Sequence, residues 1–309
     1  MKNKKILYIF FCVLIMAVLG FAAFKGLSFA MDKYHYLRET IDRIDQNTND
    51  QVTQYDFDYS WMDQNILVAH AFGGKGTKVY TNALEAFEYN YELGHRVFEV
   101  DFDLTNDDVT VCSHDEEYWR YISGNEGTET EYTYENFKNT PLFTDYTPMD
   151  YKDLVDLLCE YPDIYIITDT KYADELSVYK QFTQITDYAK EKDETVLDRL
   201  IPQIYTKEML DYVMNVYPFR SMIFTLYQIS WDSEDIAKYC IRSGVRCITV
   251  SESLIDDELV SLWKSMGLRI AVHTVNDSEQ AKQFLSDGID LIYTDFLEPA
   301  DYGIGAEDE

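Results

Sequence analysis

Residues 97–102 read Val97-Phe98-Glu99-Val100-Asp101-Phe102, an apolar run that contains two acidic residues. The apolar side chains on both faces of the stretch are typical of a strand that is buried on both sides, as in a parallel sheet. Glu99 and Asp101 are two residues apart, so their carboxylates point to the same face of the strand. Two carboxylates that are buried together repel each other unless a cation or protons intervene. The stretch therefore predicts a buried parallel strand that carries a cation-dependent site.

Short apolar runs alternate with amphipathic segments on either side of this strand. Strands are expected at 66–69, 97–101, 164–168, 200–204, 222–226, 247–250, 269–273 and 291–294. Helices are expected at 83–93, 151–161, 175–191, 207–216, 233–243, 256–266 and 278–287. Alternating strands and helices imply a parallel sheet, and eight such units suggest a TIM-type (β/α)₈ barrel. The apolar run 109–112 and the polar stretch that continues to residue 150 predict an insertion between the second strand and its helix.

An open doubly wound sheet is the alternative architecture. Such a sheet would need a phosphate-binding glycine motif after its first strand, and no GxGxxG occurs in the sequence. Gly73-Gly74-Lys75-Gly76 has neither dinucleotide-binding nor P-loop spacing. We therefore expect one closed barrel over residues 65–299.

The N-terminus predicts a membrane anchor over residues 1–30. Lys2, Lys4 and Lys5 precede an uncharged apolar run at 6–24. At 1.5 Å per residue this run spans about 28 Å, close to a bilayer core of ~30 Å. The apolar regions of signal peptides are shorter, about 7–15 residues, but Ser28-Phe29-Ala30 resembles a cleavage site, so cleavage stays open. Basic residues before the run favour a single-pass protein of the cell membrane with its catalytic domain outside the cytoplasm.

The remaining composition bounds the other segments and the partners. Residues 31–64 are expected to form a short helix and a linker, or alternatively a collar on the barrel, and residues 300–309 form an acidic tail. The formal net charge of −30 repels nucleic acid, which excludes nucleic-acid binding as the main function. The five cysteines have no metal-binding spacing, so we expect small buried side chains rather than disulfides.

Polar side chains gather where the first strands of the predicted barrel end. Active sites of such barrels lie at the carboxyl ends of the strands. His70 ends the first strand, Asp169 ends the third, and His114 follows the apolar run in the insertion. Oxygen ligands from Glu99, Asp101 and Asp169 suit a hard divalent cation, Ca²⁺ or Mg²⁺, better than Zn²⁺. An ion pair between Asp169 and Lys171 is the structural alternative.

Two later strand ends carry weaker signals. Asp295 ends the eighth strand, and we expect it to cap the following turn rather than take part in catalysis. His273 ends the seventh strand, where it either lines the pocket or packs as a structural residue.

Several motifs, in order, resemble the glycerophosphodiester phosphodiesterase family. The first half of the barrel carries His70-Ala71-Phe72-Gly73-Gly74, Asn82-Ala83-Leu84-Glu85-Ala86-Phe87, the run 98–105 and Ser113-His114-Asp115. The second half carries His273-Thr274-Val275-Asn276 and the run 288–295. The resemblance covers about residues 65–299. It implies that His70 and His114 are an acid–base pair, that Glu99, Asp101 and Asp169 bind the metal, and that Lys171 faces the phosphate.

The sequence departs from this family at three positions. Ala71 stands where the family usually has an Arg that contacts the phosphate, Thr81 stands where it has Glu, and His273 stands where it has Trp. A lysine such as Lys75, Lys78 or Lys171 would replace the Arg as a point charge rather than a bidentate fork. We expect Lys171, Lys75 and His273 to take part in substrate binding.

These observations predict a metal-dependent phosphoric diester hydrolase that acts on a glycerophosphodiester or a related lipid or envelope phosphodiester. We expect His70 to act as the base and His114 as the acid, although the sequence does not separate the two roles. The alternatives are a phospholipase C-like lipid phosphodiesterase and a catalytically lapsed barrel that acts as a binding protein. A sugar hydrolase ranks last, because it would not explain two histidines at strand ends.

Overall fold

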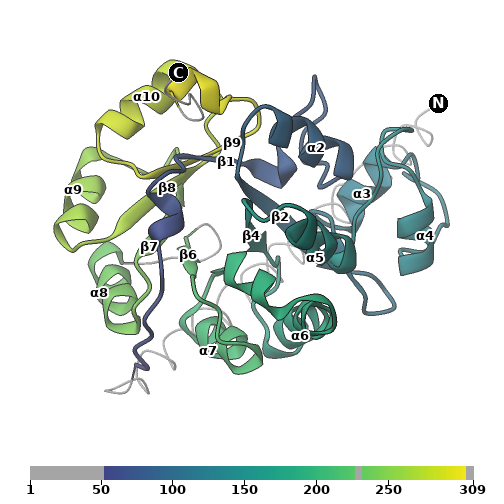
Figure 1. Ribbon diagram of the computed structural model, residues 1–309, viewed down its shortest axis with the longest axis horizontal. Helices are drawn as coiled ribbons and strands as arrows, with labels where there is room; N and C mark the ends of the chain where they lie inside the picture. The colour runs from purple at the N-terminus through teal and green to yellow at the C-terminus, as the bar shows by residue number, and fades with distance from the viewer. Residues whose placement is uncertain (1–51, 227–231, 304–309) are drawn as a thin grey trace, which may run out of the picture. The chain divides into compact units, whose positions relative to one another are not determined.

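A closed parallel barrel forms the centre of the computed structural model, which describes residues 52–226 and 232–303 (Figure 1). Its strands are β1 (Leu67–Ala69), β2 (Val97–Leu104), β4 (Tyr165–Asp169), β5 (Leu200–Ile204), β6 (Ile223–Thr225), β7 (Cys247–Ser251), β8 (Arg269–His273) and β9 (Leu291–Thr294). Strand β1 pairs in parallel with both β9 and β2, and this pairing closes the sheet. The predicted TIM barrel is thus confirmed, and the open sheet is excluded.

Helices surround the strands in Figure 1. They are α2 (Leu84–Glu92), α5 (Tyr151–Glu160), α6 (Glu175–Lys192), α7 (Lys207–Val216), α8 (Ser233–Ser243), α9 (Asp257–Ser265) and α10 (Ser278–Ser286). Short 3₁₀ helices add η1 (Ser60–Met62), η2 (His70–Phe72), η3 (Glu194–Arg199) and η4 (Pro299–Tyr302). Most of the α-helices begin at an Asp or Thr that accepts a backbone N–H in their first turn, for example Asp150 at α5 and Asp277 at α10.

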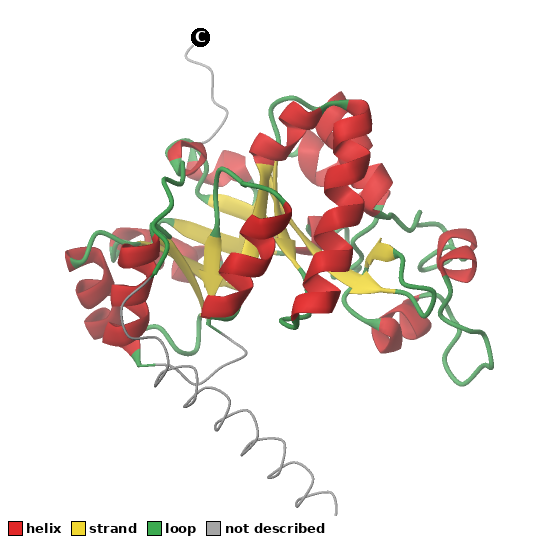
Figure 2. Ribbon diagram, turned by 90° about the horizontal axis from the view of Figure 1, so that it is seen from below, coloured by secondary structure: helices red, strands yellow, loops and turns green. Residues whose placement is uncertain are grey.

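The predicted insertion between β2 and α5 is also confirmed. It contains β3 (Thr110–Cys112), α3 (Glu116–Ile122) and α4 (Tyr134–Asn139), and β3 is antiparallel to β2. The insertion lies to one side of the barrel in Figure 2. It has a small apolar core of its own: Ala83, Val111, Trp119, Ile122, Tyr132, Phe137, Leu142 and Tyr146. This cluster is separate from the main core of the barrel.

The interior of the barrel changes from apolar to polar along every strand. Near their amino ends the strands contribute one buried apolar cluster that contains Val68, Val97, Ile167, Ile201, Ile223, Cys247, Ala271 and Leu291. Two residues further along, on the same face, stand His70, Glu99, Asp169, Gln203, Thr225, Thr249, His273 and Tyr293. The apolar layer near the amino ends (the lower layer) holds the strands in place. The polar layer near the carboxyl ends (the upper layer) lines the open mouth of the barrel.

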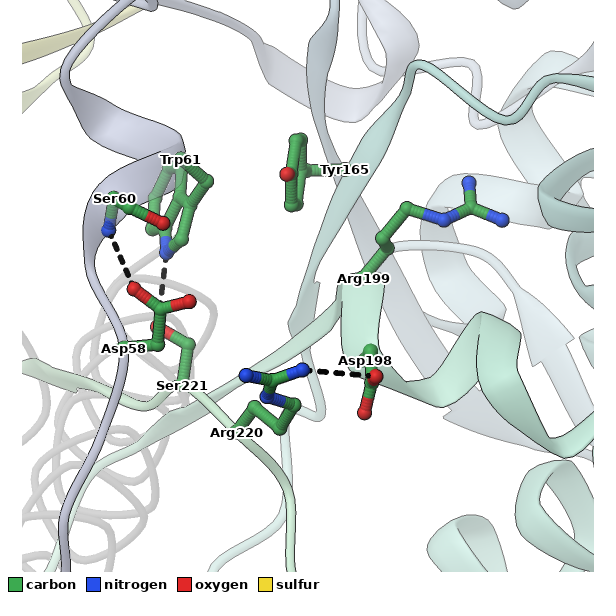
Figure 3. Close-up of a pocket in the computed structure, with 8 residues that line it drawn as sticks. All are labelled: Asp58, Ser60, Trp61, Tyr165, Asp198, Arg199, Arg220 and Ser221. Atoms are coloured by element: carbon green, nitrogen blue, oxygen red, sulfur yellow. Dashed lines mark hydrogen bonds and ion pairs between the residues drawn. The ribbon is translucent and has the colours of Figure 1, made fainter.

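Tyr59, Trp61 and Met62 of the predicted linker cover the amino end of the barrel. Tyr59 and Trp61 join the apolar cluster inside the barrel. The Tyr59 hydroxyl donates to the Met222 carbonyl (2.7 Å) and accepts from the Arg246 N–H (2.9 Å). The Trp61 indole donates to Ser221 Oγ (2.9 Å), beside a cavity of about 110 Å³ (Figure 3). The segment therefore belongs to the packed body rather than to a free linker.

The predicted anchor at residues 1–30 lies outside the described residues, as do residues 31–51. Among the helices that the structure does describe, none combines the length and the apolar character needed to span a bilayer. The cysteine prediction holds for Cys112, Cys240 and Cys247, which are buried free thiols, but Cys159 is exposed.

Candidate active site at the carboxyl-end mouth

The register of three neighbouring strands brings distant residues together at the mouth. Ala69 pairs with Phe98 on one side of β1 and with Thr294 on the other. The next residue, His70, therefore lies between Glu99 of β2 and Asp295 after β9. Only closure of the barrel makes this contact, because 225 positions separate His70 from Asp295.

Three buried carboxylates converge beside His70. One oxygen each of Glu99, Asp101 and Asp169 lies within 4.8 Å of the others. Asp101 and Asp169 are direct partners in the register of β2 and β4. The three residues are at most 6% exposed. The prediction that these three side chains meet is confirmed.

Neighbouring amides hold two of these carboxylates in position. The backbone N–H of Ala71 donates to Glu99 Oε2 (2.8 Å). The Asn82 side chain donates to Asp101 Oδ2 (2.8 Å) and accepts from the Asp101 N–H (2.9 Å). These bonds fix the carboxylates but leave their negative charge uncompensated.

Lys171 supplies part of the missing positive charge. Its ammonium lies 2.6 Å from Asp101 Oδ1 and 2.6 Å from Asp169 Oδ2, so the predicted ion pair with Asp169 is present. Burial would raise the pKa of Asp101, but Lys171 and His70 hold it below its usual range. Burial and the charge of Asp101 raise the pKa of Glu99 to about 8. An oxygen-only cluster with this excess of negative charge fits a hard divalent cation.

His70 is oriented by Asp295. Its Nδ1 lies 2.9 Å from Asp295 Oδ1, which leaves Nε2 on the side of Glu99, 3.9 Å from Oε2. Burial would lower the pKa of His70, but the bond to Asp295 and the charges of Glu99, Asp295 and Asp101 raise it to about 9. A carboxylate that holds one nitrogen of an imidazole fixes the tautomer and aims the other nitrogen.

The expectation that Asp295 caps a turn is wrong. Thr294 has that role, because its Oγ1 accepts the N–H groups of Phe296 and Leu297. The Asp295 carboxylate instead turns to His70 and accepts a bond from Asn276 Nδ2 (2.8 Å). The sequence carried one usable signal: Asp295 is two residues beyond the inward-facing Tyr293 and so shares its face.

His114 lies on the solvent side of the mouth, with a side chain that is 42% exposed. Its Nδ1 is 2.7 Å from Asp115 Oδ2, and Asp115 also caps α3 by accepting the Tyr118 N–H. Tyr80 connects the two histidines, because its ring centroid is 4.6 Å from that of His70 and 6.3 Å from that of His114. No sequence motif predicted a role for Tyr80, which lies in a loop with φ = 56°.

Of the other two predicted substrate-binding residues, His273 lies at the mouth and Lys75 does not. His273 faces inward at the end of β8, beside Tyr293 (6.3 Å between centroids). Burial and the charges of His70 and Lys171 lower the pKa of His273 to about 4, so it presents a neutral imidazole to the mouth. The Lys75 ammonium lies over the Tyr89 ring of α2, 5.5 Å from its centroid, and not at the carboxylate cluster. A phosphate-binding role for Lys75 stays a prediction without a structural contact behind it.

Strained backbone is concentrated around this mouth. Ala71, Phe72, Tyr80, Asn82 and Lys171 all have φ between 48° and 67°. Residues other than glycine rarely adopt this left-handed region, and such positions collect where surrounding contacts enforce a functional geometry.

Comparison with known proteins identifies a family for most of the chain. The model of the family described as "Glycerophosphoryl diester phosphodiesterase family" matches residues 73–299. No curated protein sequence matches the chain.

Solved structures match the fold at low sequence identity. A glycerophosphoryl diester phosphodiesterase from Silicibacter pomeroyi matches at 18% identity over 75% of this chain and 90% of its own, with a TM-score of 0.62. A phosphodiesterase from Oleispira antarctica, in complex with the product sn-glycerol-3-phosphate, matches at 16% identity over 80% and 99%, with a TM-score of 0.64. A glycerophosphodiester phosphodiesterase from Thermotoga maritima matches at 20% identity over 75% and 94%, with a TM-score of 0.55.

The family match covers most of the chain, including β2, the insertion and every later strand. The chain therefore belongs to the glycerophosphoryl diester phosphodiesterase family and is a phosphoric diester hydrolase.

Proposed function

We propose that this hydrolase cleaves glycerophosphodiesters with a divalent cation bound by Glu99, Asp101 and Asp169 and with His70 and His114 as its acid–base pair. The observation that carries the proposal is the convergence of three buried carboxylates, within 4.8 Å of one another, beside a histidine that Asp295 orients. Charges of one sign are costly to bury together unless a counter-ion compensates them.

Ca²⁺ or Mg²⁺ is the cation that this donor set fits, because every donor is a carboxylate oxygen. When bound, the cation supplies Lewis-acid stabilisation of the charge on a non-bridging phosphate oxygen. The ammonium of Lys171, which now lies between Asp101 and Asp169, is the nearest basic group for a second oxygen of the same phosphate. His273, neutral and inward-facing, completes the wall of the substrate site on the β8 side.

His70 acts as the general base through Nε2. Its Nδ1 is held by Asp295, so Nε2 is the nitrogen that faces the carboxylate cluster. The bond to Asp295 and the charges of Glu99, Asp295 and Asp101 together raise the pKa of His70. A cation held by Glu99 and Asp101 would offset the part of this effect that comes from those two carboxylates, and a lower pKa leaves the imidazole free to accept a proton.

His114 acts as the general acid for the leaving alcohol. It is half-exposed at the open side of the mouth, and Asp115 holds its Nδ1. The bond between Nδ1 and Asp115 fixes the ring, so Nε2 is the nitrogen that gives a proton to the departing oxygen. Tyr80 lies against both rings and separates the side of the base from that of the acid.

The substrate class follows from the family and from a relative. The structure of the Oleispira protein is a complex with the product sn-glycerol-3-phosphate, which supports a glycerophosphodiester as substrate here. The apolar run at 6–24 supports a single-pass anchor in the cell membrane with the barrel outside the cytoplasm.

Hydrolysis assays on the full-length protein test this proposal. We expect release of glycerol phosphate from glycerophosphodiesters with Ca²⁺ or Mg²⁺, loss of activity with chelator, and recovery when the ion is restored. Faster cleavage of phosphatidylinositol would favour a phospholipase C-like enzyme, and cleavage of glycerol-phosphate polymer alone would place the substrate in the envelope. A protein that binds the cation but cleaves none of these substrates would be a lapsed barrel.

A further inference from the structure

Three aromatic rings form a corner at the open side of the mouth. The ring centroids of Tyr80, His114 and Tyr118 are almost equidistant, with separations of 6.2–6.3 Å. Their planes are inclined to one another by 66–80°. A fourth ring, Tyr121, adjoins Tyr118 at 6.1 Å and is 59% exposed. Walls at steep angles to each other surround a compact group better than a flat stack does.

The corner is held from outside by hydrogen bonds that use the polar ends of its residues. The Tyr118 hydroxyl donates to the Val79 carbonyl (2.9 Å), next to Tyr80 in the chain. Asp115 accepts the N–H of Tyr118 and also pairs with His114. The Tyr118 hydroxyl and His114 Nδ1 are thus engaged at the backbone and at Asp115. Tyr80, His114 and Tyr118 are all only partly buried, so part of the aromatic surface is open to a ligand.

The charge around the corner is negative. Five carboxylates belong to the mouth: Glu99, Asp101, Asp115, Asp169 and Asp295. A divalent cation, Lys171 and one protonated imidazole together supply four positive charges against these five. The field reaches the rings, since burial and the charges of Asp295 and Asp101 raise the pKa of Tyr80. A phosphodiester adds one more negative charge, so a positive charge elsewhere on the substrate is favoured.

We propose that Tyr80 and Tyr118, which lie beside His114, form a subsite for an ammonium group on the leaving alcohol, and that the enzyme prefers glycerophosphodiesters with a cationic head group such as choline. Aromatic faces within about 6 Å attract such cations, most strongly where water is excluded. His114 belongs to both the corner and the acid–base pair, so the alcohol that receives its proton lies against Tyr80 and Tyr118. This assignment rests on the proposed hydrolysis of glycerophosphodiesters.

A matched pair of substrates isolates the charge. Glycerophosphocholine is compared with the glycerol phosphodiester of 3,3-dimethylbutanol, which has the same shape but carbon in place of the charged nitrogen. We expect kcat/KM to favour the choline compound by about 3- to 30-fold, the usual range for a cation on aromatic faces. A ratio near one, or a preference for the neutral compound, overturns the proposal and favours an apolar or sugar-like leaving group.

Variants locate the preference on these rings. Tyr118→Leu is expected to reduce the ratio of the two kcat/KM values to near one, mainly through KM for the choline compound. Tyr118→Phe keeps the ring, loses the bond to Val79 and is expected to retain the ratio. Tyr89→Leu is the matched control, because it removes an aromatic ring of α2 that contacts the Lys75 ammonium. This variant should leave the ratio unchanged. Persistence of the ratio in Tyr118→Leu would place the subsite elsewhere.

Calorimetry separates this proposal from the catalytic one. The affinities of His70→Ala for the two diesters are measured directly in the presence of Ca²⁺, so hydrolysis is not needed for the readout. Tighter binding of the choline compound without turnover by the wild type would support the subsite and refute the catalytic assignment. Equal binding of both compounds, with normal turnover by the wild type, would refute the subsite and support the catalytic assignment.

Discussion

The two ends of the barrel are made by the same strands from opposite kinds of residue. At the amino end, an apolar layer that contains one side chain from each strand is closed by Tyr59, Trp61 and Met62. At the carboxyl end, the same inward-facing rows continue as histidines, carboxylates and amides, and the loops that follow hold strained residues such as Ala71 and Lys171. The amino end is packed with apolar side chains like an ordinary protein core, whereas the carboxyl end buries polar groups and strained backbone.

This difference separates stability from chemistry along one axis. Buried like charges and left-handed residues destabilise the upper end, and they persist because the lower layer and the surrounding helices fix the strands. Substitutions at the two ends should therefore change different measured quantities.

Loss of either histidine should have the largest effect on activity. We expect His70→Ala or His114→Ala to reduce kcat by about 10²–10⁴, because each removes a proton-transfer group. Steady-state assays with glycerophosphocholine measure this change, and circular dichroism confirms the fold. Unchanged kcat in both variants would break the assignment of chemistry to the upper end.

A substitution at the amino end of the barrel should instead reduce stability and leave activity unchanged. Trp61→Ala is expected to lower the free energy of unfolding by about 3–5 kcal/mol, since the indole is buried and bonded to Ser221. Urea unfolding measures the loss. Ca²⁺ affinity and kcat per folded molecule should stay near wild type, and a loss of Ca²⁺ affinity would show that the two ends are coupled.

A variant at Lys171 tests what compensates the negative charge of the buried carboxylates. Its ammonium contacts Asp101 and Asp169, so it competes with a divalent ion for the same oxygens. We expect Lys171→Met to bind Ca²⁺ about tenfold or more tightly in calorimetry, because one repelling charge within a few ångströms is removed. In chelator, the variant should unfold at a lower temperature than wild type. A variant with weaker Ca²⁺ binding would refute the competition.

The pH dependence of stability should be smaller but specific to the metal-free state. The folded protein raises the pKa of His70 to about 9 and that of Glu99 to about 8, so it binds more protons than the unfolded chain. Stability should therefore fall as the pH rises from about 6.5 to 9. Below this window, His273 and His95 have pKa values lowered by burial to about 4 and act in the opposite direction.

Melting temperatures in chelator measure this effect, and Glu99→Gln supplies the matched variant. The decline with pH should be smaller in Glu99→Gln, and added Ca²⁺ should stabilise the wild type more at pH 9 than at pH 6.5. A melting temperature that rises over this interval in chelator would contradict the assigned charges.

The sequence predicted the frame of the barrel well because local periodicity determines it. Strands 200–204, 269–273 and 291–294 and helices 207–216 and 233–243 have the expected bounds. The carboxylate cluster was also predictable, since Glu99 and Asp101 share a face and Asp169 ends the neighbouring strand.

The remaining features depend on contacts that no local pattern encodes. The pairing of Asp295 with His70 follows from closure between the first and last strands. The position of Tyr80 follows from a left-handed loop residue, and that of Lys75 from a turn that directs its ammonium toward Tyr89. The burial of Tyr59 and Trp61 inside the barrel depends on the space that the assembled strands leave at their amino ends, which no local pattern encodes.

Anomalous diffraction from crystals soaked in Mn²⁺, an ion that accepts the same oxygen ligands, tests the central claim most directly. We expect one strong peak among the carboxylate oxygens of Glu99, Asp101 and Asp169, with the Lys171 ammonium moved away from Asp101. A map with no peak there, and with Lys171 still bridging Asp101 and Asp169 at saturating Mn²⁺, would contradict the account.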